Sequence, residues 1–249
     1  MEILRVLGRG RQAEFELVRY KGELYAKSWK YSPLPPCHNL PHVVNTQVMD
    51  GHYLWELCDT IPETEGLDPA LHLDYEIRIR MQMIAARFEL ASMCIVPEEN
   101  QYMLSTKDYR VKQMDLDGRT HRLKTATGYN GPYDLEEIYQ SSIQGILYPS
   151  DLVWIGAIPS ERVSYDVVKS LDPEKMLRLY CRKVYERYHT VKYSLDDFTY
   201  DFPDIDLNAD LRVVVFSLIN ALETYVFPKQ TEILDHLMQR KPKRKRVDV

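Results

Sequence analysis

Two acidic side chains near the middle of the chain could hold a metal ion. Asp115 and Asp117 stand just before Gly118, in the sequence Met-Asp-Leu-Asp-Gly. Magnesium prefers oxygen ligands such as carboxylates, so this pair predicts a magnesium contact. The competing interpretation is a plain Asp-Gly turn between two strands. The sequence leaves both interpretations open.

A glycine-rich turn near the start of the chain could approach a phosphate group. Gly8 and Gly10 flank Arg9, and Ala13 follows three residues later. Residues without a large side chain let backbone N–H groups come close to phosphate oxygens. Glycine turns between strands are common, so this motif alone does not identify a nucleotide site.

Two further clusters favour structural roles over metal binding. Residues 204–210 alternate oxygen-bearing side chains like a calcium loop, but Ala209 and Val215 replace the required Gly and Glu. A helix-capping loop before Leu211 is therefore favoured. Five Cys and His side chains fall within residues 37–58, but their spacing matches no common zinc finger, which favours packing and solvent contacts. They are Cys37, His38, His42, His52 and Cys58.

The last ten residues, 240–249, form a basic run that is typical of a nuclear localisation signal. An unfolded cationic strand can lie in the acidic groove of a nuclear import receptor. The alternatives are a solvated tail, or an anchor to RNA or anionic lipid. The residues predicted to bind the receptor are Lys241, Lys243, Arg244, Lys245 and Arg246.

The elements that must position these groups change in type along the chain, from strands to helices. Lys21-Gly22 and Asp50-Gly51 predict two hairpin turns. Four prolines in residues 31–45 exclude a regular helix there. The strands are expected at residues 3–7, 15–20, 23–29, 43–49, 52–58, 102–105 and 110–114. The helices are expected at residues 74–93, 152–158, 173–188 and 211–226, with Ser150-Asp151 capping the second. This order predicts an α+β protein.

Composition predicts a folded chain that does not enter a membrane. Hydrophobic residues make up 45% and charged residues 28%, enough for a core and too varied for disorder. There is no apolar run of about 18 residues and no signal peptide. The four cysteines form no CxxC pair, which indicates free thiols in a reducing compartment. The nucleus, the cytoplasm or both are therefore expected.

The charge distribution disfavours nucleic acid as a partner of the folded part. The net charge is -5, and residues 240–249 hold six Lys and Arg against one Asp, so the other 239 residues carry about -10. An acidic surface repels phosphates.

Six segments, in order, resemble protein kinases. Residues 7–15 resemble the glycine-rich loop, with Ala13 at the third glycine, and residues 54–59 resemble the strand and hinge that hold adenine. The other four resemble the helix before the catalytic loop, the strands ending in the metal-binding Asp, the end of the activation segment and the start of a buried helix. They are residues 84–96, 103–118, 128–132 and 149–156.

The resemblance implies a two-lobed kinase-like fold that uses ATP and magnesium. Residues 1–59 would form a reduced sheet lobe, residues 60–239 a helical lobe and residues 240–249 a tail. Glu99 would stand in the place of the catalytic Asp, and Asp115 with Asp117 would hold the metal. The nucleotide would contact Gly8, Gly10, Ala13, Lys27, Glu56 and Cys58.

The chain departs from the kinase pattern where phosphoryl transfer needs charged groups. The family places its phosphate-binding Lys two residues after an Ala, but here Ala26 and Lys27 are adjacent and must face opposite ways. Either Lys27 faces the phosphates, or Ala26 is correctly placed and Ser28 replaces the Lys. The helical Glu that pairs with this Lys is missing, because no Glu occurs between Glu23 and Glu56. Lys27 is therefore expected to lack that partner.

The catalytic loop is also shortened, with Asn100 directly after Glu99. We therefore expect a pseudokinase-like protein that acts through protein partners. The alternatives are an active atypical kinase that uses Glu99 and Asp115, and a nuclear effector of another fold with a basic tail.

Overall fold

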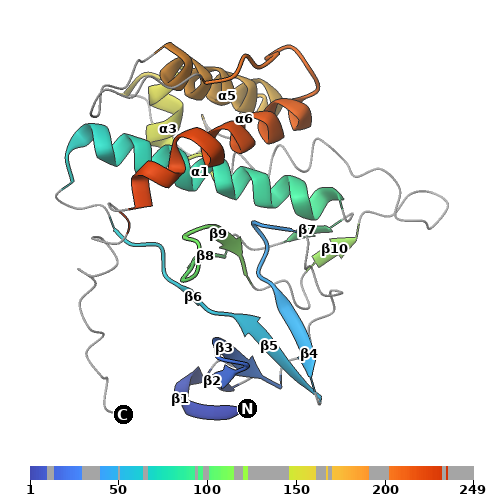
Figure 1. Cartoon of the computed structure of the whole chain (residues 1–249). Coiled ribbons are helices and arrows are strands. Elements are labelled where there is room, and N and C mark those ends of the chain that lie inside the picture. Colours follow the sequence, from blue (N-terminus) through green and yellow to red (C-terminus); the bar gives the residue numbers. More distant parts are fainter. Residues whose placement is uncertain are drawn as a thin grey trace.

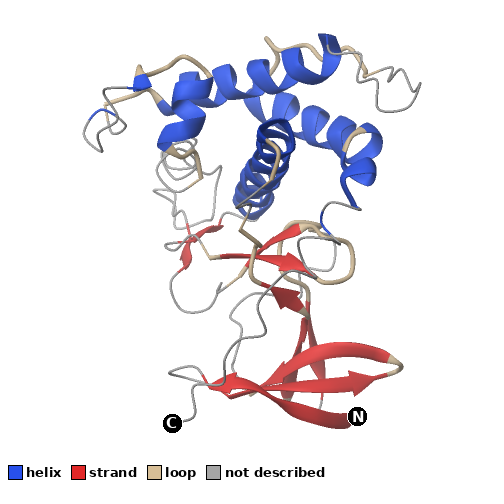
Figure 2. Cartoon of the chain, turned by 90° about the vertical axis from the view of Figure 1, so that its left-hand side faces the viewer, coloured by secondary structure: helices blue, strands red, loops and turns tan. Residues whose placement is uncertain are grey.

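The helices and the largest sheet occupy opposite ends of the molecule, and two small sheets lie between them (Figures 1 and 2). The chain is thus an α+β protein, as the order of elements predicts. The computed structural model describes residues 1–9, 14–29, 40–49, 51–63, 67–92, 95–97, 101–114, 120–122, 146–160, 167, 170–190, 202–231 and 234.

The N-terminal sheet contains five antiparallel strands in the order β1-β2-β3-β5-β4. All five lie within residues 1–59, where the apolar runs predict them. Their bounds are Glu2–Arg9 (β1), Glu14–Tyr20 (β2), Glu23–Ser28 (β3), Thr46–Met49 (β4) and His52–Glu56 (β5).

Both predicted hairpins are present. The β2–β3 turn places Lys21 at φ 51° and Gly22 at φ 86°, the left-handed backbone that matches the twist of paired strands. Gly51 has φ 75° between β4 and β5, a value that favours glycine.

The small sheets connect the N-terminal sheet to the helices. One pairs β6 (Cys58–Asp59), β8 (Tyr102–Ser105) and β9 (Val111–Gln113), and the other pairs β7 (Ile95–Pro97) with β10 (Thr120–Arg122). The prediction of one strand over residues 52–58 is wrong, because β5 ends at Glu56 and β6 joins a different sheet. The strand expected from residue 43 begins only at Thr46, since Val43 instead forms a bridge to Gln113.

The long helix α1 (Pro69–Ser92) spans the helical part on the side that faces the small sheets (Figure 1). Ile77, Met81, Ile84 and Phe88, which repeat along the helix at helical spacing, are fully buried. Charged side chains of the same helix are buried as well, including Arg80 and Arg87. These side chains have partners: Arg80 bonds to Asp151 and Arg87 bonds to Tyr102.

Three further helices pack around α1. They are α3 (Pro149–Trp154), α5 (Pro173–Thr190) and α6 (Leu211–Tyr225), followed by the short helix η2 (Phe227–Gln230). Asp210 caps α6 through the backbone N–H of Arg212, which confirms the predicted capping loop. No described helix is long and apolar enough to cross a membrane.

The expected cap of the helix over residues 152–158 is wrong. Helix α3 starts earlier, with Pro149 in its first turn and Tyr148 before it, because proline suits that position. Asp151 lies inside the helix and accepts a hydrogen bond from Tyr148 N at 2.7 Å.

Candidate functional site

An apolar cluster fills the junction between the N-terminal sheet and the rest of the molecule. Its buried members are Val43, Val44, Trp55 and Leu90, so it joins β5 to the end of α1. We call it the junction cluster. Partly buried side chains from β2, β3, β5, β6 and two loops pack against it, namely Phe15, Ala26, Leu40, Tyr53, Cys58 and Met114.

The pairing of β3 decides which way Ala26 and Lys27 face. Ala26 lies between Leu17 of β2 and Trp55 of β5, and it packs against the junction cluster. Neighbouring residues in a strand point to opposite faces. Lys27 therefore points away from the cluster. The sequence allowed either Lys27 or Ala26 on this face of β3, and the structure places Ala26 there.

Ser28 occupies the position two residues after Ala26, on the same face of β3. Its side chain is buried, and its hydroxyl accepts a hydrogen bond from Trp55 Nε1 at 2.9 Å. A neutral hydroxyl, held by an indole N–H, thus stands where the kinase pattern requires a lysine.

Lys27 has an ion-pair partner on the opposite face of the sheet. Its Nζ lies 3.0 Å from Oε2 of Glu16, the residue directly across in β2, and 5.8 Å from the centre of the Trp29 ring. The sequence suggested only the loss of a helical Glu. Pairing the two strands of the predicted hairpin residue by residue places Glu16 directly across from Lys27, so the sequence did contain a signal for this partner.

The expected hinge residues Glu56 and Cys58 connect the sheets. The Glu56 carboxylate lies 3.2 Å from Lys112 Nζ and accepts a 2.7 Å hydrogen bond from Ser105 Oγ, which ties β5 to β8 and β9. Burial, with the nearby charge of Glu56, raises the pKa of the Cys58 thiol to about 12. Cys58 and the buried Cys181 are free cysteines.

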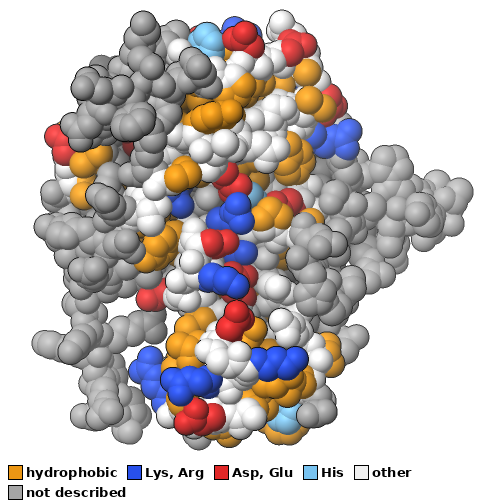
Figure 3. All heavy atoms as spheres, viewed as in Figure 1, with side chains coloured by type: hydrophobic (Ala, Val, Ile, Leu, Met, Phe, Trp, Pro, Cys, Tyr) orange, Lys and Arg blue, Asp and Glu red, His pale blue; other side chains and the backbone are white. Residues whose placement is uncertain are grey.

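A charge network continues this connection toward the helices. His42 is buried, with Nδ1 2.6 Å from Glu89 Oε1 of α1 and Nε2 2.9 Å from Glu223 Oε1 of α6. Arg110 donates to both oxygens of Glu223, and it also pairs with Asp108. Figure 3 shows acidic and basic side chains alternating along the middle of the molecule, on the face seen in Figure 1.

The other predicted site residues are less informative. Gly8 lies in β1 opposite Phe15, beside a shift in the β1–β2 register between Val6 and Gly8, and an added Cβ would meet nothing within 4 Å. His52 stacks on Trp29, with ring centres 3.5 Å apart. Within the described ranges, no group of three His, Cys, Asp or Glu could hold a metal. Outside the described residues lie Gly10, Ala13, Cys37, His38, Glu99, Asp115, Asp117, Lys241, Lys243, Arg244, Lys245 and Arg246.

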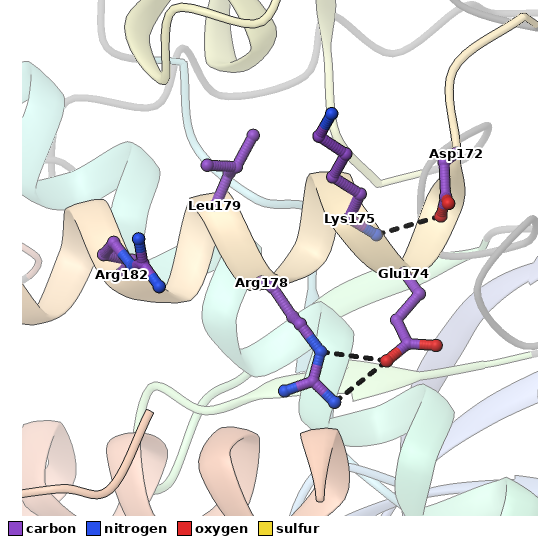
Figure 4. A pocket seen from close by; sticks show the side chains of 6 residues that line it. All are labelled: Asp172, Glu174, Lys175, Arg178, Leu179 and Arg182. Carbon is purple, nitrogen blue, oxygen red and sulfur yellow. Dashed lines mark hydrogen bonds and ion pairs between the residues drawn. The ribbon is translucent and has the colours of Figure 1, made fainter. Parts of the chain in front are cut away.

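An open groove of about 380 Å³ lies along the first turns of α5 (Figure 4). Its described lining comes from this helix and from Asp172 just before it. Arg178 pairs with Glu174 at 2.9 Å, so two of its charges neutralise each other. Because no second described element closes the groove, we place the candidate site at the junction cluster instead.

No protein-family model matches this chain, and no curated protein sequence matches it.

Proposed function

We propose that this chain is a protein-kinase-like protein that has lost efficient phosphoryl transfer and acts by binding protein partners. The proposed arrangement has two lobes, the N-terminal sheet and the helical part. Six ordered sequence segments support the resemblance, and the α+β order of the elements is compatible with it.

The observation that carries the proposal is the exchange of a lysine for a serine beside the junction cluster. Phosphoryl transfer depends on positive charge that stabilises the phosphates. Ser28 supplies none, and its hydroxyl is engaged by Trp55. The adjacent Lys27 faces the other side of the sheet and is neutralised by Glu16.

The described residues fit only part of a nucleotide. Ala26, Phe15 and Met114 offer an apolar surface of the kind that packs against a flat base. The phosphates would rely on the loop that follows Gly8, and magnesium on Asp115 and Asp117. ATP binding without efficient transfer is the activity that this set of residues supports best.

A phosphoryl-transfer assay tests the proposal directly. The wild-type chain is incubated with radiolabelled ATP, magnesium and general protein substrates, beside the Lys27→Ala and Glu99→Gln variants. We expect no transfer above background in any of the three. Transfer by the wild type that disappears in either variant would overturn the proposal and favour the active atypical kinase.

A thermal-shift titration with ATP and magnesium then asks whether a nucleotide site remains. A ligand that binds only the folded state raises the melting temperature, and the rise grows as the ligand concentration exceeds the dissociation constant. We expect Asp115→Ala to remove a magnesium-dependent rise and Lys27→Ala to leave it unchanged. Removal of the rise by Lys27→Ala would contradict the orientation of β3.

We further propose that residues 240–249 direct the protein to the nucleus through an import receptor. The six basic side chains in this run support the proposal. Deleting these ten residues should release a fluorescent fusion from the nucleus. Unchanged nuclear accumulation of the shortened fusion would refute it.

A further inference from the structure

The buried His42 ring lies between two carboxylates. Both of its nitrogens are within hydrogen-bond distance of a glutamate oxygen, 2.6 Å for Glu89 and 2.9 Å for Glu223. The backbone N–H of His42 also donates to Glu89, at 2.9 Å. Only 2% of this residue is exposed, so the ring is shielded from solvent.

With both glutamates ionised, this geometry is satisfied only by a doubly protonated ring. A neutral imidazole carries one N–H, and its other nitrogen is an acceptor. An acceptor nitrogen facing a carboxylate oxygen would leave two lone pairs in contact inside the protein. The imidazolium instead donates to both carboxylates, and its charge offsets one of them.

With His42 positive, the charges described around the ring are balanced. His42 and Arg110 then carry two positive charges against those of Glu89 and Glu223. Two other charged groups belong to this network. Arg78 of α1 interacts electrostatically with Glu223. Asp108, in the turn between β8 and β9, pairs with Arg110. Loss of the histidine proton would leave a buried negative charge, which is costly at this depth.

The ring joins segments that are far apart in the sequence. His42 precedes Val43 and Val44, which belong to the junction cluster between the N-terminal sheet and α1. Val44 N donates to Gln113 O at 3.1 Å, and Gln113 N donates to His42 O at 2.8 Å. The His42 side chain therefore fixes residues 42–44 on α1 and α6, and through the cluster it sets how the sheet meets the helices.

We propose that His42 is a protonation-dependent latch, in which the doubly protonated ring holds the N-terminal sheet on the helices and the neutral ring releases it. This conformational device needs neither ATP nor the kinase resemblance. It therefore stands or falls separately from the proposed function.

The direction of the pH effect follows from the neighbours of the ring. Burial by itself lowers the pKa of His42, but the hydrogen bonds and charges of Glu223 and Glu89 outweigh it and raise the pKa above its usual 6.5. The latch is fully closed below 6.5 and opens as the pH rises through the folded-state pKa. Between these two values, one proton is lost on opening, so the opening equilibrium grows about tenfold per pH unit.

Two measurements on the wild-type protein test the latch. NMR titration of the histidine ring nitrogens should give His42 a pKa above 6.5. Amide hydrogen exchange, corrected for its intrinsic pH dependence, should show about tenfold faster opening per pH unit at Val44 and Gln113. The β2–β3 hairpin should lack this added slope. A His42 pKa at or below 6.5, or opening at Val44 and Gln113 with no added slope, would overturn the proposal.

Variants separate the latch from a general loss of stability. Glu223→Gln removes one charge from the pair and should lower the His42 pKa, moving the opening of Val44 to lower pH. His72→Gln is the matched control, because His72 is an exposed residue of α1 that lies 3.5 Å from Glu76. His72→Gln should leave both the His42 pKa and the pH dependence of opening at Val44 unchanged. An unchanged His42 pKa in Glu223→Gln would contradict the latch even if the variant unfolds more easily.

Discussion

The hydrogen bond between Ser28 and Trp55 provides the sharpest test of how β3 is oriented. Ser28→Ala removes the acceptor of Trp55 Nε1, and the indole is only 6% exposed. A buried donor that loses its partner costs about 1–3 kcal/mol. We expect the free energy of unfolding to fall by that amount. Trp55→Phe removes the donor along with part of the packing of the junction cluster.

A double-mutant cycle isolates the bond from the packing. The measurement is urea unfolding followed by far-UV circular dichroism on the wild type, both single variants and the double variant. The coupling energy should be about 1 kcal/mol. Ser170→Ala is the control, because the Ser170 hydroxyl is exposed and its loss should cost at most about 0.5 kcal/mol. A coupling energy near zero would mean that Ser28 does not face Trp55 and would refute the argument from strand alternation.

Two further changes have effects that follow from buried charges. Asp151→Ala removes the 3.0 Å partner of the buried Arg80, which keeps its 2.7 Å ion pair with Glu76, and should lower the free energy of unfolding by about 1–3 kcal/mol, measured by urea unfolding; a loss below about 0.5 kcal/mol would contradict the Arg80–Asp151 ion pair. Burial raises the pKa of Glu223, but His42 and Arg110 outweigh it and lower the pKa to about 2. Its contribution to stability is complete above about 4.5 and disappears as the pH falls through about 2. Urea midpoints at pH 6, 4 and 2.5 should therefore converge for the wild type and Glu223→Gln, and parallel midpoints would refute the shift.

Local sequence signals predicted the N-terminal sheet well. The turns at Lys21-Gly22 and Gly51 depend on backbone geometry that few residues tolerate, so they fix where the hairpins bend. Asp210 likewise predicted the start of α6, because a side-chain cap acts within three residues. The β5–β6 break was missed, since the change of sheet at Leu57 depends on β8, which lies far along the chain.

Contacts between segments that are far apart in the chain could not be predicted from the sequence. His42 belonged to an apparent Cys and His cluster, but its partners Glu89 and Glu223 are 47 and 181 residues away. The helix expected at residues 74–93 was found, but the burial of its charged side chains depends on partners from other elements, such as Asp151 for Arg80. Of the predicted nucleotide-binding residues, the structure places Lys27 on the face of the sheet away from Ala26.

The two-residue turn between β2 and β3 carries a consequence for the evolution of this chain. Side chains in a strand alternate, so a slip of one position exchanges the two faces of β3. Deleting a single residue between β2 and Tyr25, with the ladder to β5 kept in place, would carry Tyr25 and the ammonium group of Lys27 to the side of the junction cluster and turn Ala26 and Ser28 to the other surface. One residue of length in this turn thus decides whether β3 presents a serine or a lysine to the junction cluster, and chains with a shorter or longer turn here should differ in which of the two they present.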